Sequence, residues 1–142
     1  MTVPVVVDTN VVVAGLISRP AESPVCRMLD GMLTGRLAFL LSVDLLDEYR
    51  RVLLRPAIEN LHGLSADQVD AILTVIAANA IIREPISSQA LQAPDRGDDH
   101  LWELLAAVPG AMLVIGDRVL LEQPPDFASV ISHRTFTESF DD

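Results

Sequence analysis

The chain opens with Val3-Pro4-Val5-Val6-Val7-Asp8, and this stretch decides the fold class. A short β-branched run without charged residues is typical of a strand that is buried on both faces of a parallel sheet. An acid directly after such a strand lies at the carboxyl end of the sheet, where ligands bind in α/β proteins. Asp8 therefore either caps a helix that follows or belongs to a functional site.

The rest of the chain alternates short apolar runs with stretches of helical periodicity. Further strands are expected at 37–41, 81–82, 111–115 and 130–131, and helices at 21–33, 43–54, 66–78, 98–108 and 135–140. Ser42 and Ser65 stand where they can cap two of these helices. This alternation predicts an α/β fold: one domain over residues 1–142, with a parallel sheet of four to five strands and helices on both faces.

Length and composition agree with one domain of this kind. The chain has 142 residues, 50% of them apolar and 4% aromatic, so Val, Leu, Ile and Ala must build the core. We find no run long enough for a membrane helix and no secretory signal at the N-terminus. Cys26 is the only cysteine, which excludes an internal disulfide and a cysteine zinc cluster. These features predict a cytoplasmic protein with no membrane partner.

The net charge of −10 argues at first sight against a nucleic-acid partner, because proteins that bind polyanions usually carry a basic face. Two interpretations remain open. The acids may be ordinary surface groups that keep the protein solvated. Alternatively, some of them converge on a cation, whose charge reverses the local potential. Composition does not choose between these interpretations, but the positions of the acids along the chain do.

A second acid, Asp117, follows the expected strand 111–115 after one glycine. Taken alone, it is as readily part of a Gly-Asp turn as of a functional site. Asp8 and Asp117 nevertheless reach the same edge of a parallel sheet from distant parts of the sequence. Thr9 and Asn10 could orient the Asp8 carboxylate, or they could form a local turn.

Glu48 lies at the border of the apolar face of the expected helix 43–54. At about 100° per residue, the neighbouring Asp47 points nearly opposite that face, into solvent. A border acid can lean over the sheet edge and serve a site, or it can pair with Arg51 on the helix surface. Arg51 and Arg55 flank the same edge, where they could bind phosphates of a substrate.

The densest acid cluster comprises Asp95, Asp98 and Asp99. Asp98 precedes Leu101 by three residues and Leu105 by seven, so it lies over the buried face of the expected helix. Asp99 turns toward the exposed side. The alternative is that Asp98 caps the helix and Asp99 favours its dipole, while Asp95 either supports a site or lies in a plain loop.

Several carboxylates that converge at one edge repel each other, and a divalent cation removes this conflict. Mg²⁺ and Mn²⁺ prefer oxygen ligands and are suited to phosphodiester hydrolysis. The three histidines, His62, His100 and His133, are too scattered for a zinc site. The sequence contains neither a nucleophile elbow nor a glycine-rich phosphate loop. The acids therefore indicate a metal-dependent hydrolase.

Four segments carry these acids: Val6-Val7-Asp8-Thr9-Asn10-Val11, Leu45-Leu46-Asp47-Glu48-Tyr49-Arg50-Arg51-Val52-Leu53, Asp95-Arg96-Gly97-Asp98-Asp99-His100-Leu101 and Val114-Ile115-Gly116-Asp117-Arg118-Val119-Leu120-Leu121. In this order and spacing, they resemble the four motifs of the PIN-domain nucleases. One such motif would be weak, but four in order over nearly the whole chain are specific. The branch that looks most similar contains the toxins of bacterial type II toxin–antitoxin pairs.

The resemblance implies an endoribonuclease that depends on Mg²⁺ or Mn²⁺ and is inhibited by a cognate antitoxin protein. Its catalytic, metal-binding acids map onto Asp8, Glu48, Asp98 and Asp117. The hydroxyl that the family places beside the first acid maps onto Thr9. We further expect RNA as the substrate and a homodimer as the assembly.

Two positions depart from the family pattern. Val119 stands where many relatives carry a second Asp after the fourth acid, which leaves the number of bound metal ions open. Asp99 stands where relatives often have Asn.

Other functions make different demands on the sequence. A phospho-accepting signalling domain needs a Lys late in the chain, and this sequence has no Lys. A phosphatase of the haloacid-dehalogenase type needs a second Asp two residues after the first, where this chain has Asn10. A catalytically decayed PIN-like binding module stays open, and it would lack a Mn²⁺ site.

Overall fold

The computed structural model describes residues 4–18, 23–84, 99–115 and 129–132. Its strands form one five-stranded sheet in the order β3-β2-β1-β4-β5, and each neighbouring pair is parallel. The strands are β1 (Val5–Val7), β2 (Phe39–Leu41), β3 (Ile81–Ile82), β4 (Met112–Ile115) and β5 (Ser129–Ser132). The prediction of an α/β fold with a parallel sheet is confirmed.

Strand β1 occupies the centre of the sheet. Val5 pairs with Phe39 of β2 on one side and with Met112 of β4 on the other. All three valines of β1 are fully buried, and successive side chains of a strand point to opposite faces. The sheet is therefore covered on both faces at this strand, a position that suits β-branched side chains. Asp8, immediately after β1, starts at the middle of the carboxyl edge.

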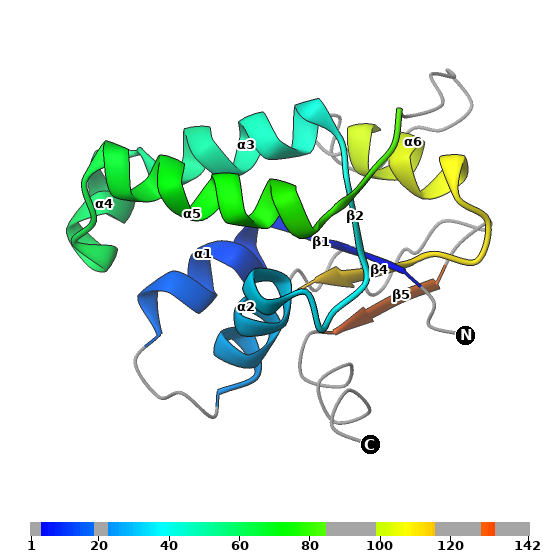
Figure 1. The fold of residues 1–142 in the computed structure, drawn as a ribbon, viewed down its shortest axis with the longest axis horizontal. Coiled ribbons are helices and arrows are strands. Elements are labelled where there is room, and N and C mark those ends of the chain that lie inside the picture. The colour runs from blue at the N-terminus through cyan, green and yellow to red at the C-terminus, as the bar shows by residue number, and fades with distance from the viewer. Residues whose placement is uncertain (1–3, 19–22, 85–98, 116–128, 133–142) are drawn as a thin grey trace.

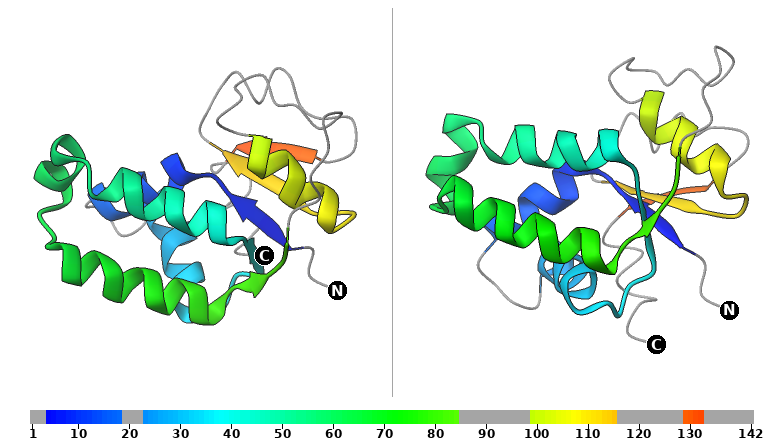
Figure 2. Two further views of the ribbon diagram at one scale, coloured as in Figure 1. Left: turned by 90° about the horizontal axis from the view of Figure 1, so that it is seen from above. Right: turned by 45° about the horizontal axis from the view of Figure 1, so that its top comes forward.

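Six helices pack around the sheet within the described ranges: α1 (Thr9–Ile17), α2 (Pro24–Thr34), α3 (Val43–Leu53), α4 (Pro56–His62), α5 (Ala66–Asn79) and α6 (Asp99–Ala107). Helices α3 and α5 lie side by side, and α1 packs against both α2 and α3 (Figure 1). Helix α6 contacts β1 and α3, and its place beside the strands can be followed in Figure 2. Helices α1, α3 and α6 thus all reach the surroundings of β1.

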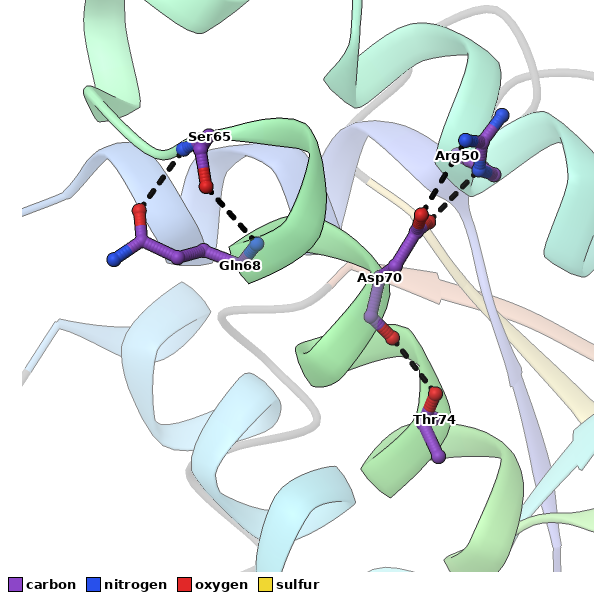
Figure 3. Close-up of polar contacts among 5 residues, drawn as sticks. All are labelled: Arg50, Ser65, Gln68, Asp70 and Thr74. Carbon is purple, nitrogen blue, oxygen red and sulfur yellow. Dashed lines mark hydrogen bonds and ion pairs between the residues drawn. The ribbon is translucent and has the colours of Figure 1, made fainter.

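Both serine caps that the sequence predicts are confirmed. The Ser42 hydroxyl accepts a hydrogen bond from the Leu45 N–H at 3.1 Å, where α3 begins. Ser65 and Gln68 form a reciprocal capping box at the start of α5 (Figure 3). These caps satisfy N–H groups that would otherwise lack partners in the first helical turn. The Ser42 cap sets the starting point of α3, the helix that carries Glu48.

The sequence pattern does not predict helices α1 and α4. The valines at 11–13 favour a strand by propensity, yet they are buried within α1. This helix packs closely on α2 at Gly15, where an added Cβ would lie 2.8 Å from the Val25 carbonyl oxygen and 2.9 Å from Leu29 Cβ. Tertiary packing therefore overrides local preference in α1. Helix α4 is short and has no fully buried residue, so it leaves little periodicity to detect.

The remaining elements begin and end within a few residues of expectation. The expected helix at 98–108 corresponds to α6, and the expected strand at 130–131 corresponds to β5. The expected helix at 135–140 lies outside the described residues. In the part of the chain that the structure describes, no helix has the length and apolar character to span a membrane.

Candidate active site at the carboxyl end of β1

Asp8 follows β1 directly and occupies the N-cap position of α1. Its backbone carbonyl accepts the Val11 N–H at 3.0 Å, but its carboxylate makes no capping hydrogen bond to the described turn of α1. The residue is only 5% exposed. The helix N-terminus favours a negative charge at this position. The structure therefore does not support the interpretation of the Asp8 side chain as a simple helix cap.

Glu48 leans from α3 toward the start of α1. Its side chain is 16% exposed, whereas the neighbouring Asp47 is exposed, as the helical geometry predicts. The Thr9 hydroxyl donates a hydrogen bond to Glu48 Oε2 across a separation of 39 positions in the sequence. This contact brings the acid on α3 to the residue that follows Asp8.

The other carboxylate oxygen of Glu48 faces two basic side chains. His100 Nε2, from the second residue of α6, lies 3.4 Å from Oε1, and the ring is as little exposed as Glu48 itself. Arg51 Nη2 lies 3.9 Å from the same oxygen, but the Arg51 side chain is 66% exposed. The surface pair between Glu48 and Arg51 therefore exists only as a long contact that solvent weakens. Three helices, α1, α3 and α6, meet at one carboxylate.

These polar contacts decide the ionisation of Glu48. Burial raises the pKa of its carboxyl group. Hydrogen bonds from His100 and Thr9, together with the charges of His100 and Arg51, act in the opposite direction and leave the pKa below its ordinary value of 4.5. Glu48 is therefore an ionised carboxylate at neutral pH, although much of it is withdrawn from solvent.

Tyr49 anchors α3 to the end of β1. Its side chain is fully buried, and its hydroxyl donates a hydrogen bond of 2.5 Å to the Val7 carbonyl oxygen. Burial raises the pKa of Tyr49 well above its ordinary value, and the charges of Asp8 and Glu48 raise it further, so the hydroxyl stays protonated. Both acids therefore lie near the same buried hydroxyl. The sequence pattern marks Tyr49 only as an apolar position of α3.

Three candidate residues near these acids have described side chains. Thr9 is 4% exposed and holds Glu48. Asn10 is exposed on α1, and Arg55 is exposed where α4 begins, seven residues after Glu48. Arg51, one of the two arginines that the sequence suggests for phosphate binding, contacts Glu48.

The other candidate acids are not placed by the structure. Asp99 begins α6, but its side chain is not among those described, and Asp95, Asp98 and Asp117 lie outside the described residues altogether. Within the described ranges, no group of three or more His, Cys, Asp or Glu side chains is arranged to hold a metal ion. Asp8 and Glu48 offer carboxylate oxygens, the donors that a hard divalent cation prefers. They fit part of such a site.

The sequence pattern also does not single out His100, because its histidines are too scattered for zinc. One signal was present in the sequence: His100 precedes Leu104 by four residues, which places both on one side of α6. Leu104 is fully buried, so His100 faces the interior and reaches Glu48.

A comparison with known families matches the PIN-domain model to residues 4–119. The chain belongs to the PIN-domain family. PIN domains are generally nucleases and typically use divalent metal ions. No curated protein and no solved structure gives a significant match to the chain. The PIN-domain match begins just before β1 and spans all four acids that the sequence motifs suggest.

Proposed function

We propose that this PIN-domain protein is a divalent-metal-dependent endoribonuclease and the toxin of a toxin–antitoxin pair, acting in the cytoplasm. The observation that carries the nuclease activity is the Thr9–Glu48 hydrogen bond beside Asp8. It ties Glu48 to the residue that follows Asp8 at the carboxyl end of the central strand, where α/β proteins bind ligands. RNA as substrate and the toxin role rest on the resemblance of the sequence motifs.

The proposed metal ligands are Asp8, Glu48, Asp98 and Asp117. Val7 of β1 pairs with Val114 of β4, so the two strands end side by side, and β4 ends two residues before Asp117. Helix α6 begins one residue after Asp98, and its second residue, His100, contacts Glu48. Both remaining acids therefore lie within two residues, in the sequence, of a described element. Bound Mg²⁺ or Mn²⁺ would orient the phosphate, activate water and stabilise the leaving oxygen.

The other residues of the proposed site have supporting roles. Thr9 holds one oxygen of Glu48, and Arg51 presents an exposed guanidinium at the rim, where it can bind a phosphate. Arg55 would extend this contact along the RNA. Asn10, Asp95 and Asp99 are proposed to support the acids without binding metal. A bound cation would reverse the local potential at this site, so a protein with a net charge of −10 could still bind a polyanionic substrate there.

A cleavage assay tests the nuclease proposal. The purified protein should cut single-stranded RNA in Mn²⁺ or Mg²⁺ and should stop when a chelator is added. Asp8→Asn should slow cleavage at least about a hundredfold, since it removes charge from a metal ligand and keeps its shape. Asp47→Asn, which removes an exposed acid of α3, is the matched control and should cut like the parent. Equal rates for Asp8→Asn and the parent would contradict the site.

A second pair of variants tests the acids around the start of α6. We propose that Asp98 binds metal and that Asp99 does not, because the sequence spacing of Asp98 from Leu101 and Leu105 predicts that it lies over the buried face of the helix. Asp98→Asn should therefore abolish cleavage, while Asp99→Asn should keep most of it. The reverse order would show that the helix presents its acids in a register shifted by one residue.

The biological role and the assembly need separate measurements. A toxin should arrest growth when it is expressed alone, and co-expression of the small protein encoded beside it should relieve the arrest. Light scattering should give the mass of a homodimer of the single domain proposed for residues 1–142. A parent protein that binds RNA but neither cuts it nor binds Mn²⁺ would instead be a decayed PIN-like binding module.

A further inference from the structure

The two oxygens of the Glu48 carboxylate have different partners on different helices. Oε2 accepts the hydrogen bond from Thr9 at the start of α1, and Oε1 faces His100 Nε2 of α6 at 3.4 Å. A carboxylate held at one oxygen can still rotate about its last side-chain bond. A carboxylate held at both oxygens has one orientation. Its remaining lone pairs then point in fixed directions.

We propose that His100 is a positioning residue, which orients the Glu48 carboxylate through Oε1 and so sets the affinity of the site for a divalent cation. This inference rests on the proposed function, because it takes Glu48 as a metal ligand. Groups that hold the ligands of a metal ion often influence affinity nearly as strongly as the ligands themselves.

The surroundings of His100 suit this role. Leu101, Trp102 and Leu104 are all nearly or fully buried, so the first turns of α6 are anchored in the core. The imidazole itself is only 16% exposed and has two rotatable side-chain bonds. A side chain that is held by a packed helix loses little further freedom when it contacts Glu48.

Arg51 is the alternative partner of the same oxygen, and it is less suited. Its contact with Oε1 is longer, at 3.9 Å, and 66% of its side chain is exposed. A long, exposed arginine loses more conformational freedom when it is fixed in one geometry, and water competes for its hydrogen bonds. We therefore assign the orientation of the Glu48 carboxylate to His100 and Thr9 and not to Arg51.

The position of His100 also links two parts of the proposed site. Helix α6 contacts both α3 and β1, and it begins one residue after Asp98. The contact between His100 and Glu48 therefore sets the start of α6 against the middle of α3. His100 would hold one proposed ligand directly and fix the helix that follows another.

Three substitutions of His100 distinguish the effect of its hydrogen-bond donor from the effects of its charge and its volume. His100→Gln can place an amide nitrogen where Nε2 stands, and it keeps a donor without a titratable ring. His100→Asn carries the same amide on a chain one methylene shorter, which does not reach Oε1. His100→Leu has a similar volume, a higher helix propensity and no donor. Arg50→Gln, on the part of α3 that faces α5, is the control.

The quantity to measure is the dissociation constant for Mn²⁺ alone, by calorimetry or from the electron paramagnetic resonance signal of free Mn²⁺. His100→Asn and His100→Leu should weaken Mn²⁺ binding about tenfold or more, and His100→Gln should stay within about threefold of the parent. Arg50→Gln should bind like the parent. Melting in chelator reports the metal-free fold, and it checks that each variant is folded at the temperature of the titration.

The outcomes are distinguishable. If the parent binds Mn²⁺ and all three His100 variants bind it equally well, the inference is wrong and the proposed function stands. If Gln weakens binding as much as Asn, His100 does not act through a donor at the Nε2 position, and the inference is again wrong. If the parent binds no Mn²⁺, the proposed function and the inference fail together. Should His100→Leu not fold, the comparison between Gln and Asn still decides.

Discussion

Two acids lie on different sides of helix α3, and they differ in burial and in their partners: Glu48 belongs to α3 itself, and Asp70 belongs to α5. Glu48, on the side of β1, is 16% exposed and accepts the hydrogen bond from Thr9. Asp70 of α5, on the other side, pairs with Arg50 at 2.8 Å, with both side chains about half exposed (Figure 3). Both acids have a pKa below the ordinary value.

The causes of the two lowered pKa values are different. For Asp70, the hydrogen bond from Arg50 is the largest cause, and it outweighs the opposing effect of desolvation. For Glu48, burial raises the pKa and polar contacts must outweigh it. Placing an acid where burial opposes its charge costs stability unless partners compensate. The Arg50–Asp70 pair has the shorter contact, whereas Glu48, the acid that we propose to be functional, is the more buried of the two.

A pocket lies on the side of α3 that faces α5. A cavity of about 340 Å³ opens between α3 and α5, and Leu46, Asp47, Arg50, Asp70, Leu73, Thr74 and Ala77 line it. It includes the exposed ion pair and none of the acids at the carboxyl end of β1.

The largest expected effect separates the two acids by activity. Glu48→Gln should lower the initial rate of RNA cleavage in Mn²⁺ about a hundredfold, because a proposed metal ligand loses its charge. Asp70→Asn should leave the rate within about twofold, because an exposed pair contributes little. Equal losses in the two variants would remove the functional distinction between the two sides of α3.

The next effect concerns two hydroxyl groups, one buried and one exposed. Tyr49→Phe leaves the Val7 carbonyl without its donor, and the free energy of unfolding should fall by about 1–3 kcal/mol. Thr74→Val removes a hydroxyl that bonds the Asp70 carbonyl on the exposed face of α5, and it should change stability by less than about 0.5 kcal/mol. Urea denaturation of both variants measures the difference. Similar values would show that the Tyr49 hydroxyl does not anchor α3.

A smaller effect is expected at Thr9. Thr9→Val keeps the shape of the side chain and removes the hydrogen bond to Glu48 Oε2, which should weaken Mn²⁺ binding about tenfold. Thr9→Ser keeps the hydroxyl and should bind Mn²⁺ nearly as well as the parent. Calorimetric titration of the two variants is the measurement. Binding by Thr9→Val as tight as that of the parent would contradict this role of the hydrogen bond.

The smallest effect is a pH dependence at the exposed pair. Because Arg50 lowers the pKa of Asp70 from 3.8, the pair stabilises the fold above that value, and the contribution is lost as pH falls through the lowered pKa. The parent should therefore melt slightly higher than Asp70→Asn at about pH 6 and no higher at about pH 2. A large difference at neutral pH would mean that the exposed pair matters more than its surroundings indicate.

The local sequence pattern is sufficient to predict much of the fold and part of the candidate site. The buried valines of β1, the serine caps of α3 and α5, and the border position of Glu48 depend on interactions within a few residues. Such features repeat with the period of a strand or a helix, so the chain itself displays them. The parallel sheet follows from their alternation, and it places Asp8 at the carboxyl edge.

Only the tertiary structure decided which side chains meet. Helix α1 forms against the local preference of its valines because Gly15 lets α2 approach closely. The Thr9–Glu48 and Tyr49–Val7 hydrogen bonds span 39 and 42 positions, and His100 reaches Glu48 from another helix. No local periodicity specifies such pairs, because they depend on how helices pack across the sheet. Because the helices pack together, Glu48, a border residue of α3, contacts Thr9 of α1 and His100 of α6.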